Sequence, residues 1–104
     1  MPQFDVYENP NSETRQVFPY LLDVQADLLD NLPTRVVVPL VAVSSLRKTA
    51  PLLNPLLTIN GTDLVMLTTQ MTGVSLPALG IRICSLRDHR QEILAALDFL
   101  FTGY

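Results

Sequence analysis

The chain has 104 residues, of which 48% are hydrophobic and only 16% charged, and its formal net charge is −3. A chain of this length forms one domain with a single core, and about 25% of residues are charged in a typical domain. The shortage of charge indicates that another subunit covers part of the surface. Because nucleic-acid binders present a basic stripe, we expect no direct nucleic-acid binding by this chain alone.

The first third of the chain predicts two strands separated by a polar turn. Residues 3–7 alternate polar and apolar side chains, which is typical of a strand. Residues 8–16 are rich in Asn, Pro, Ser and Thr and indicate a mobile turn. Residues 20–24 predict a second strand. Asp23, Asp27 and Asp30 follow with the spacing of an exposed acidic face, or of caps and turns, and we assign them no catalytic role.

The middle of the chain carries the clearest β signals. Residues 34–43 hold many β-branched valines, and Pro39 among them marks an edge or a bulge because proline cannot donate to a ladder. Residues 56–59 and 62–67 form a hairpin, since Asn60-Gly61 takes the positive φ angles of its turn. Residues 68–80 are less regular, with apolar side chains that we expect to pack inward: Met71, Val74 and Leu76.

The last 24 residues predict a short strand at 81–84 and then one helix. Ser85 is expected to cap the helix, with Asp88 completing a capping box, and Gly103 to end it. Ile93, Leu97 and Leu100 repeat at helical spacing. The terminal turns carry more apolar side chains than one packing face needs, which favours association with a second subunit or another protein as the function.

The chain shows few groups for chemistry. It has no glycine-rich phosphate loop and no metal-ligand spacing, and we expect no enzyme activity, cofactor or metal. Cys84 is either a small buried apolar residue or a thiol activated by the helix N-terminus and nearby arginines. His89 is expected on the solvated surface. Because neither a secretory signal nor an apolar run of ~20 residues is present, we expect a cytoplasmic protein that does not bind membranes.

Several segments resemble the CcdB toxins of type II toxin–antitoxin modules, in the family's order and over the whole length. They are residues 3–7, 23–30, 35–40, 66–71 and the ending from His89 to Tyr104. The resemblance implies a single CcdB-like toxin domain over residues 1–104. The expected fold is mostly β, an SH3-like barrel of antiparallel strands with one C-terminal α-helix, and the expected assembly is a homodimer.

The resemblance also implies a function. The dimer of such a toxin binds the A subunit of DNA gyrase and traps it on cleaved DNA, so that double-strand breaks accumulate. A CcdA-like antitoxin neutralises the toxin, and the complex represses its own operon through DNA contacts made by the antitoxin. The positions expected to bind gyrase are Leu28, Leu29, Asp98, Phe101, Thr102, Gly103 and Tyr104. Those expected to bind the antitoxin are Glu8, Asn9, Asn11, Ser12, Glu13 and Arg15.

The tail departs from the best-known family pattern, because Thr102 stands where that pattern has Trp and Tyr104 where it ends in Ile. Two other functions stay open. One is a MazF-like endoribonuclease on the same barrel, for which Arg35 is the only strand arginine near a plausible site. The other is an inactive homologue that retains only antitoxin binding. Individual residues have simpler alternatives: Leu28 and Leu29 as core, Phe101 as dimer packing, Gly103 as a helix stop, and residues 8–16 as a solvated turn.

Overall fold

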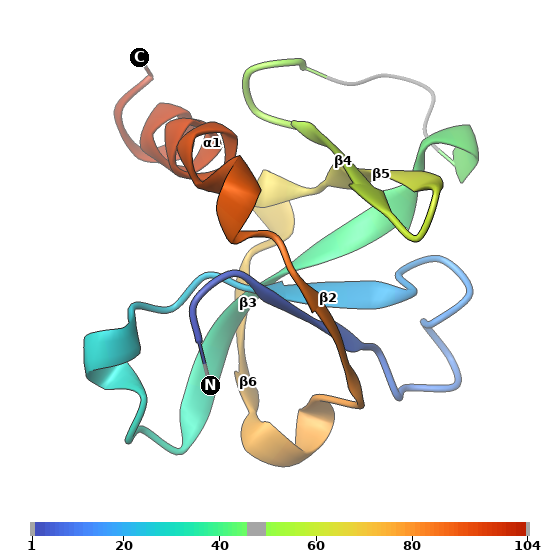
Figure 1. Ribbon diagram of the computed structural model, residues 1–104, viewed down its shortest axis with the longest axis vertical. Coiled ribbons are helices and arrows are strands. Elements are labelled where there is room, and N and C mark those ends of the chain that lie inside the picture. Colours follow the sequence, from blue (N-terminus) through green and yellow to red (C-terminus); the bar gives the residue numbers. More distant parts are fainter. Residues whose placement is uncertain (1, 46–49, 104) are drawn as a thin grey trace.

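The computed structural model describes residues 2–45 and 50–103. In these ranges seven antiparallel strands form one curled sheet, and a helix packs against one end of it (Figure 1). This arrangement confirms the mostly β prediction and fits an SH3-like barrel. The strands are β1 (Asp5–Glu8), β2 (Tyr20–Asp23), β3 (Thr34–Ala42), β4 (Leu56–Ile59), β5 (Thr62–Met66), β6 (Thr72–Ser75) and β7 (Arg82–Ser85). The helix is α1 (Arg90–Thr102), and the short 3-10 turns are η1 (Asp27–Leu29), η2 (Val43–Ser45), η3 (Thr68–Gln70), η4 (Leu76–Ala78) and η5 (Arg87–His89).

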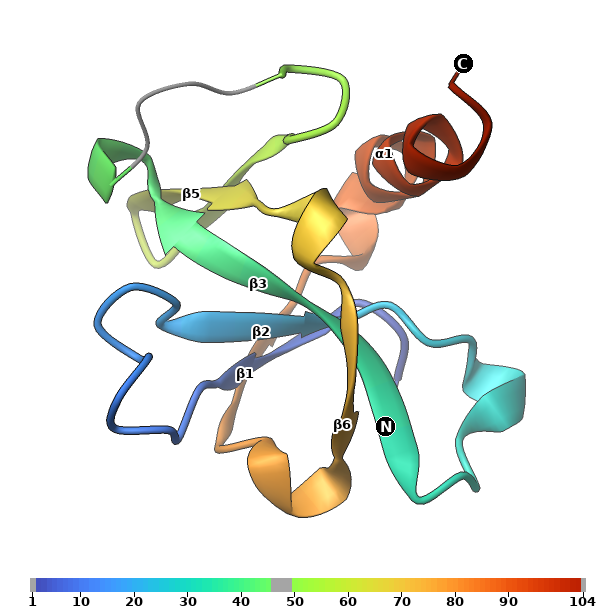
Figure 2. The same cartoon turned by 180° about the vertical axis from the view of Figure 1, so that it is seen from behind.

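Strand β3 organises the sheet. The strand order is β4-β5-β3-β2-β1-β7, and β6 pairs with β3 off this path. One side of β3 pairs with β2, and its other side is shared between β6, along residues 34–37, and β5, along residues 40–42. Figure 2 shows β3 crossing the molecule between these partners. The sheet can curl because β3 changes partner along its length.

Pro39 lies at this change of partner, so the prediction of an edge or a bulge is wrong. The residue is buried in a central strand, and its register with β2 is regular through the pair Leu21 and Pro39. The Leu67 N–H donates to the Pro39 carbonyl at 3.0 Å, so the backbone of Pro39 faces the side shared by β5 and β6. The missing N–H therefore falls where the ladder passes from one partner to the other.

The hairpin of β4 and β5 is confirmed. Ile59 pairs with Thr62, and the two turn residues between them have φ angles of 51° (Asn60) and 79° (Gly61). Positive φ at both positions matches the twist of the flanking strands. The hairpin brings its inward side chains to the core, whose fully buried members include Val6, Leu22, Val38, Leu40, Leu57, Ile59, Leu64, Met66 and Ile93.

The start of the helix differs from the prediction. Ser85 ends β7, where it pairs with Asp5, and the next residue is anchored because the Leu86 N–H donates to the Phe4 carbonyl at 2.8 Å. The chain then passes through η5 before α1 begins at Arg90, so Ser85 and Asp88 form no capping box for α1. The Ser85 hydroxyl accepts instead from the Arg87 N–H at 3.2 Å.

The end of the helix is as predicted. Gly103 adopts a left-handed φ of 78°, and its N–H donates to the Phe99 carbonyl at 2.9 Å. Between the hairpin and α1, β7 confirms the last predicted strand, whereas β6 was not foreseen. Met71 packs against the core and Val74 is half-buried, but Leu76 is 39% exposed, so its predicted inward packing is wrong.

Candidate protein-binding site

The last turn of α1 exposes a large apolar side chain. Ile93 and Ala96 face the core and are fully buried, and Leu97 packs beside them. Phe99 and Leu100 are half-buried, whereas Phe101 is 67% exposed. The helix therefore buries one stripe and leaves Phe101 at its end, near the C-terminus in the upper part of Figure 1. Within one protomer, Phe101 has little role in packing.

The other expected tail residues surround Phe101 on the exposed final turns. Asp98, Thr102 and Gly103 are exposed, and the Thr102 hydroxyl donates to the Asp98 carbonyl at 2.7 Å. That hydrogen bond keeps Thr102 helical up to the Gly103 stop. Tyr104 lies outside the described residues. The structure thus brings four of the seven expected gyrase-binding positions to one end of α1.

The paired leucines lie elsewhere, on η1. Leu28 is 95% exposed and Leu29 is 48% exposed, so the alternative that they belong to the core is wrong. Figures 1 and 2 both place η1 in the lower half of the molecule and α1 in the upper half. Within one protomer the leucines and the tail therefore form two separate patches.

A buried ion pair underlies η1. Arg35 is 0% exposed, and its Nε and Nη2 lie 2.8 and 2.6 Å from Asp23 Oδ2, while Nη1 lies 2.9 Å from Asp30 Oδ1. Burial raises the pKa of the Asp23 carboxyl, against the opposing effect of the Arg35 hydrogen bond. The three aspartates therefore do not form one acidic face, since Asp23 is buried and Asp27 accepts the Gln3 N–H at 2.7 Å.

The position of Arg35 removes the basis of the endoribonuclease alternative. A guanidinium that is sealed from solvent and paired with carboxylates cannot reach a phosphodiester. Nor is Arg35 alone, because Arg82 of β7 is a second strand arginine, with its Nε 2.7 Å from Oδ2 of the buried Asp5. Sequence analysis missed this network, although an arginine within a valine run, preceded by several aspartates, is a usable signal for a buried ion pair.

The turn between β1 and β2 is folded around two asparagines. Asn9 is buried, and its Nδ2 donates to Thr14 Oγ1 and to the Phe18 carbonyl, both at 2.9 Å. Its Oδ1 accepts the Asn11 N–H at 3.1 Å, and Asn11 Oδ1 accepts the Glu13 N–H at 2.9 Å. These hydrogen bonds give residues 8–19 a defined shape. Asn9 is therefore not part of a merely solvated turn, which was the alternative for this segment.

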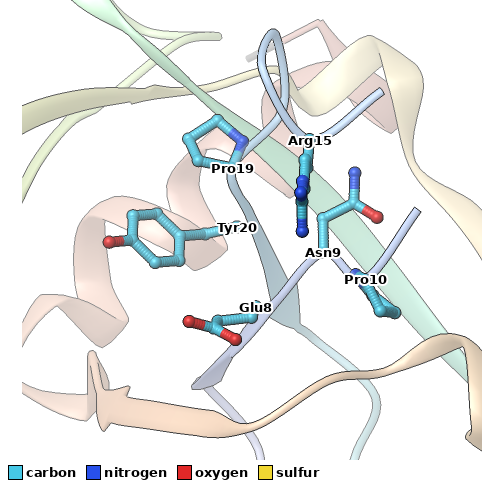
Figure 3. Close-up of a pocket in the computed structure, with 6 residues that line it drawn as sticks. All are labelled: Glu8, Asn9, Pro10, Arg15, Pro19 and Tyr20. Atoms are coloured by element: carbon cyan, nitrogen blue, oxygen red, sulfur yellow. The ribbon is translucent and has the colours of Figure 1, made fainter. Parts of the chain in front are cut away.

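Two neighbouring hollows lie against this turn. The first has a volume of about 350 Å³, and Figure 3 shows Arg15 extending from the turn toward Glu8, with Tyr20 beside it. It is lined by Glu8, Asn9, Pro10, Arg15, Pro19 and Tyr20. The second hollow has a volume of about 340 Å³. Its apolar lining residues are Pro10, Phe18, Leu21, Pro39, Val74 and Ala78, and its polar ones are Asn9, Asn11 and Thr14.

The hollows bring together most of the expected antitoxin-binding residues. Glu8, Asn9 and Arg15 line the first hollow, and Asn9 and Asn11 line the second. Ser12 and Glu13 are exposed on the turn and line neither. Tyr20 lines the first hollow and Phe18 the second; neither was among the predicted site residues, although both follow the polar segment in the sequence.

Two side chains that the sequence singles out for possible chemistry are Cys84 and His89. Cys84 lies half-buried in β7, and burial raises the pKa of its thiol, so the interpretation of a thiol activated by a helix N-terminus is wrong. His89 is partly exposed, with Nδ1 3.0 Å from Glu92 Oε2. Among residues 2–45 and 50–103, no group of three or more His, Cys, Asp and Glu side chains could hold a metal ion.

The part of the chain that the structure describes contains no helix with the length and apolar character needed to cross a membrane.

Residues 3–103 match the family model described as CcdB protein. Membership of that family implies a toxin of a toxin–antitoxin module that targets gyrase, with a CcdA antitoxin as partner and dimerisation. Since the match spans almost the whole sequence, the chain belongs to the CcdB family.

Proposed function

We propose that the chain acts as a homodimer that binds the A subunit of DNA gyrase and holds the enzyme on cleaved DNA, without catalysing a reaction itself. The observation that carries this proposal is the exposure of Phe101 at the end of α1. A large aromatic side chain on the rigid end of a helix is a suitable anchor for a protein interface. Asp98, Thr102 and Gly103 are exposed on the same final turns and form the rest of the proposed contact at the helix end, with Tyr104 next in the sequence.

Trapping an enzyme requires selective binding and no chemistry. A ligand shifts a two-state equilibrium from 1:99 to 99:1 if it binds the favoured state by about 5.5 kcal/mol more tightly. Full burial of one large apolar side chain contributes about 1.5–3 kcal/mol. Phe101, Leu28 and Leu29 are exposed apolar side chains of this size. Weighted by their exposed fractions, all three side chains together would contribute about 3–6 kcal/mol, a range that includes the required difference if the contacts are made only with the cleaved-DNA state of gyrase.

The proposed gyrase contact extends to η1. Leu28 and Leu29 of η1 and the nearby Leu32 are all exposed, and exposed apolar side chains gathered in one segment mark a candidate contact surface. Because η1 and the helix end are separate patches in one protomer, the target must contact the toxin over an extended area or meet patches from both subunits of the dimer.

For the antitoxin we propose the turn formed by residues 8–19 and its two hollows as the binding surface. The turn has a defined shape, so binding does not have to order it. Arg15 offers a positive group to an acidic segment, and the apolar hollow offers a seat for a large side chain. An Arg15→Ala variant should then be neutralised less well by the antitoxin, whereas Arg87→Ala, an exposed arginine on η5 outside both hollows, should behave as the native chain.

The experiment that tests the proposed function is a gyrase cleavage assay. Purified chain is mixed with gyrase and supercoiled DNA, and the DNA is analysed after denaturation of the protein. The proposal predicts linear DNA that increases with toxin concentration, and protection of cells that carry a resistant A-subunit variant. Degradation of RNA that is independent of gyrase would contradict the proposal and restore the endoribonuclease alternative.

A further inference from the structure

The exposed leucines of η1 have no apolar anchor of their own. None of the residues of η1 is buried, and the segment from Ala26 to Pro33 is exposed throughout. A segment of this kind has few packing contacts to hold one conformation, and such segments open easily. The leucines nevertheless occupy a defined turn, in which the Leu29 N–H donates to the Ala26 carbonyl at 2.9 Å.

Polar side chains beneath the turn supply the missing anchor. Gln25 is buried; its Nε2 donates to the Leu29 carbonyl at 2.8 Å, and its Oε1 accepts the Val36 N–H of β3 at 3.0 Å. Arg35, also on β3, donates through Nη1 to Asp30 Oδ1 at 2.9 Å, at the end of the turn. Asp23 Oδ1 accepts the Gln25 N–H at 3.0 Å, which joins the two groups into one network.

We infer that Arg35 and Gln25 are positioning residues, whose bonds to Asp30 and to the Leu29 carbonyl hold Leu28 and Leu29 in the conformation that gyrase binds. This inference rests on the proposed function. A hydrogen bond to a charged group is stronger than one between neutral groups, and the Arg35 end of the network is sealed from solvent. The turn is thus ordered before the target arrives, so that binding does not have to order it.

The test uses Asp30→Ala, because the Asp30 side chain is 46% exposed and its removal leaves the buried pair of Arg35 and Asp23 in place. The matched control is Asp63→Ala on the β4–β5 hairpin, where the exposed Asp63 Oδ1 accepts a hydrogen bond from the Thr58 hydroxyl at 2.8 Å. Both variants are measured for dissociation from the purified gyrase A subunit, alone and combined with Leu28→Ala.

We expect Asp30→Ala to weaken binding about fivefold, because affinity falls with the fraction of molecules in the competent conformation. Asp63→Ala should bind as the native chain. Amide hydrogen exchange at Leu29 and at position 30 should accelerate in Asp30→Ala while exchange in β3 and β5 is unchanged, which a general loss of stability would not produce. On the Leu28→Ala background, Asp30→Ala should have little further effect on binding.

Three results would overturn the inference. If Leu28→Ala weakens binding but Asp30→Ala does not, the leucines contact gyrase and the network does not position them. If Asp30→Ala weakens binding equally on both backgrounds, Asp30 acts independently of Leu28. If Leu28→Ala itself has no effect, the η1 contact is refuted and the positioning role is refuted with it, while binding through the helix end is measured separately by tail variants.

Discussion

Replacing Phe101 by alanine separates binding from folding. The side chain is 67% exposed, so about two-thirds of its burial energy is still to be gained when a partner covers it. Full burial contributes about 1.5–3 kcal/mol, which leaves about 1–2 kcal/mol for the interface. Since about 1.4 kcal/mol corresponds to a factor of ten, we expect Phe101→Ala to bind the gyrase A subunit about 5-fold to 30-fold more weakly.

The same substitution should hardly affect folding. Only a third of the side chain is covered in the protomer, so the free energy of unfolding should fall by less than about 1 kcal/mol. Ile93→Val is the matched control, because Ile93 lies on the same helix and is fully buried. It should lower the free energy of unfolding by about 0.5–1.5 kcal/mol and leave gyrase binding unchanged.

The assay is biolayer interferometry with immobilised A subunit, accompanied by urea unfolding and sedimentation of each variant. All variants are compared at one protein concentration, because the stability of a dimer depends on it. Native affinity of Phe101→Ala would refute the proposed contact. Dissociation of the variant into monomers would also refute the proposed gyrase contact of Phe101, because it would show that Phe101 belongs to the dimer interface.

Other predictions concern the turn and the cysteine. Asn9→Ala should lower the free energy of unfolding by about 2 kcal/mol, since it leaves the Phe18 carbonyl without its side-chain donor, and it should weaken antitoxin binding; native stability in urea unfolding would contradict the role of Asn9. Cys84 should react with iodoacetamide at pH 8 more slowly than a cysteine peptide, because the raised pKa of the thiol reduces the thiolate. Because its pKa is raised in the folded state, the Cys84 thiol binds its proton more tightly there than in the unfolded state. The free energy of unfolding therefore has its full contribution from Cys84 below the ordinary pKa of a thiol and loses that contribution as the pH rises through the raised pKa. Faster reaction of the folded chain than of the peptide would contradict both statements.

Elements defined by local chemistry could be predicted from the sequence. Asn60-Gly61 fixes its own turn through backbone preference, and Gly103 does the same for the helix end. The start of α1 was missed because Ser85 and Asp88 resemble a capping box, whereas the pairing of β7 with β1 and the bond from the Leu86 N–H to Phe4 are contacts distant in sequence. β6 was missed for the same reason, since its mostly exposed residues show no alternation and pair only with β3.

In the candidate site too, features set by local sequence could be predicted and features set by contacts between segments could not. The surplus of apolar side chains at the helix end is visible in the sequence, and Phe101 is indeed exposed. The pair of Asp23 and Arg35 leaves only an indirect signal in the sequence, an arginine within a valine run after several aspartates, because the spacing does not show that the pairing of β2 with β3 brings the two side chains together. The burial of Asn9 could not be read from a polar segment either, since the side chain turns inward to bond its own loop.

The most direct measurement of the central claim is the binding of purified gyrase A subunit to the chain with and without residues 102–104. Thr102 ends α1 and Gly103 follows it, and both residues are exposed. The account predicts that the shortened chain still sediments as a folded dimer at micromolar concentration but binds gyrase more weakly and no longer kills cells. A shortened dimer that binds gyrase with the affinity of the full chain would contradict it.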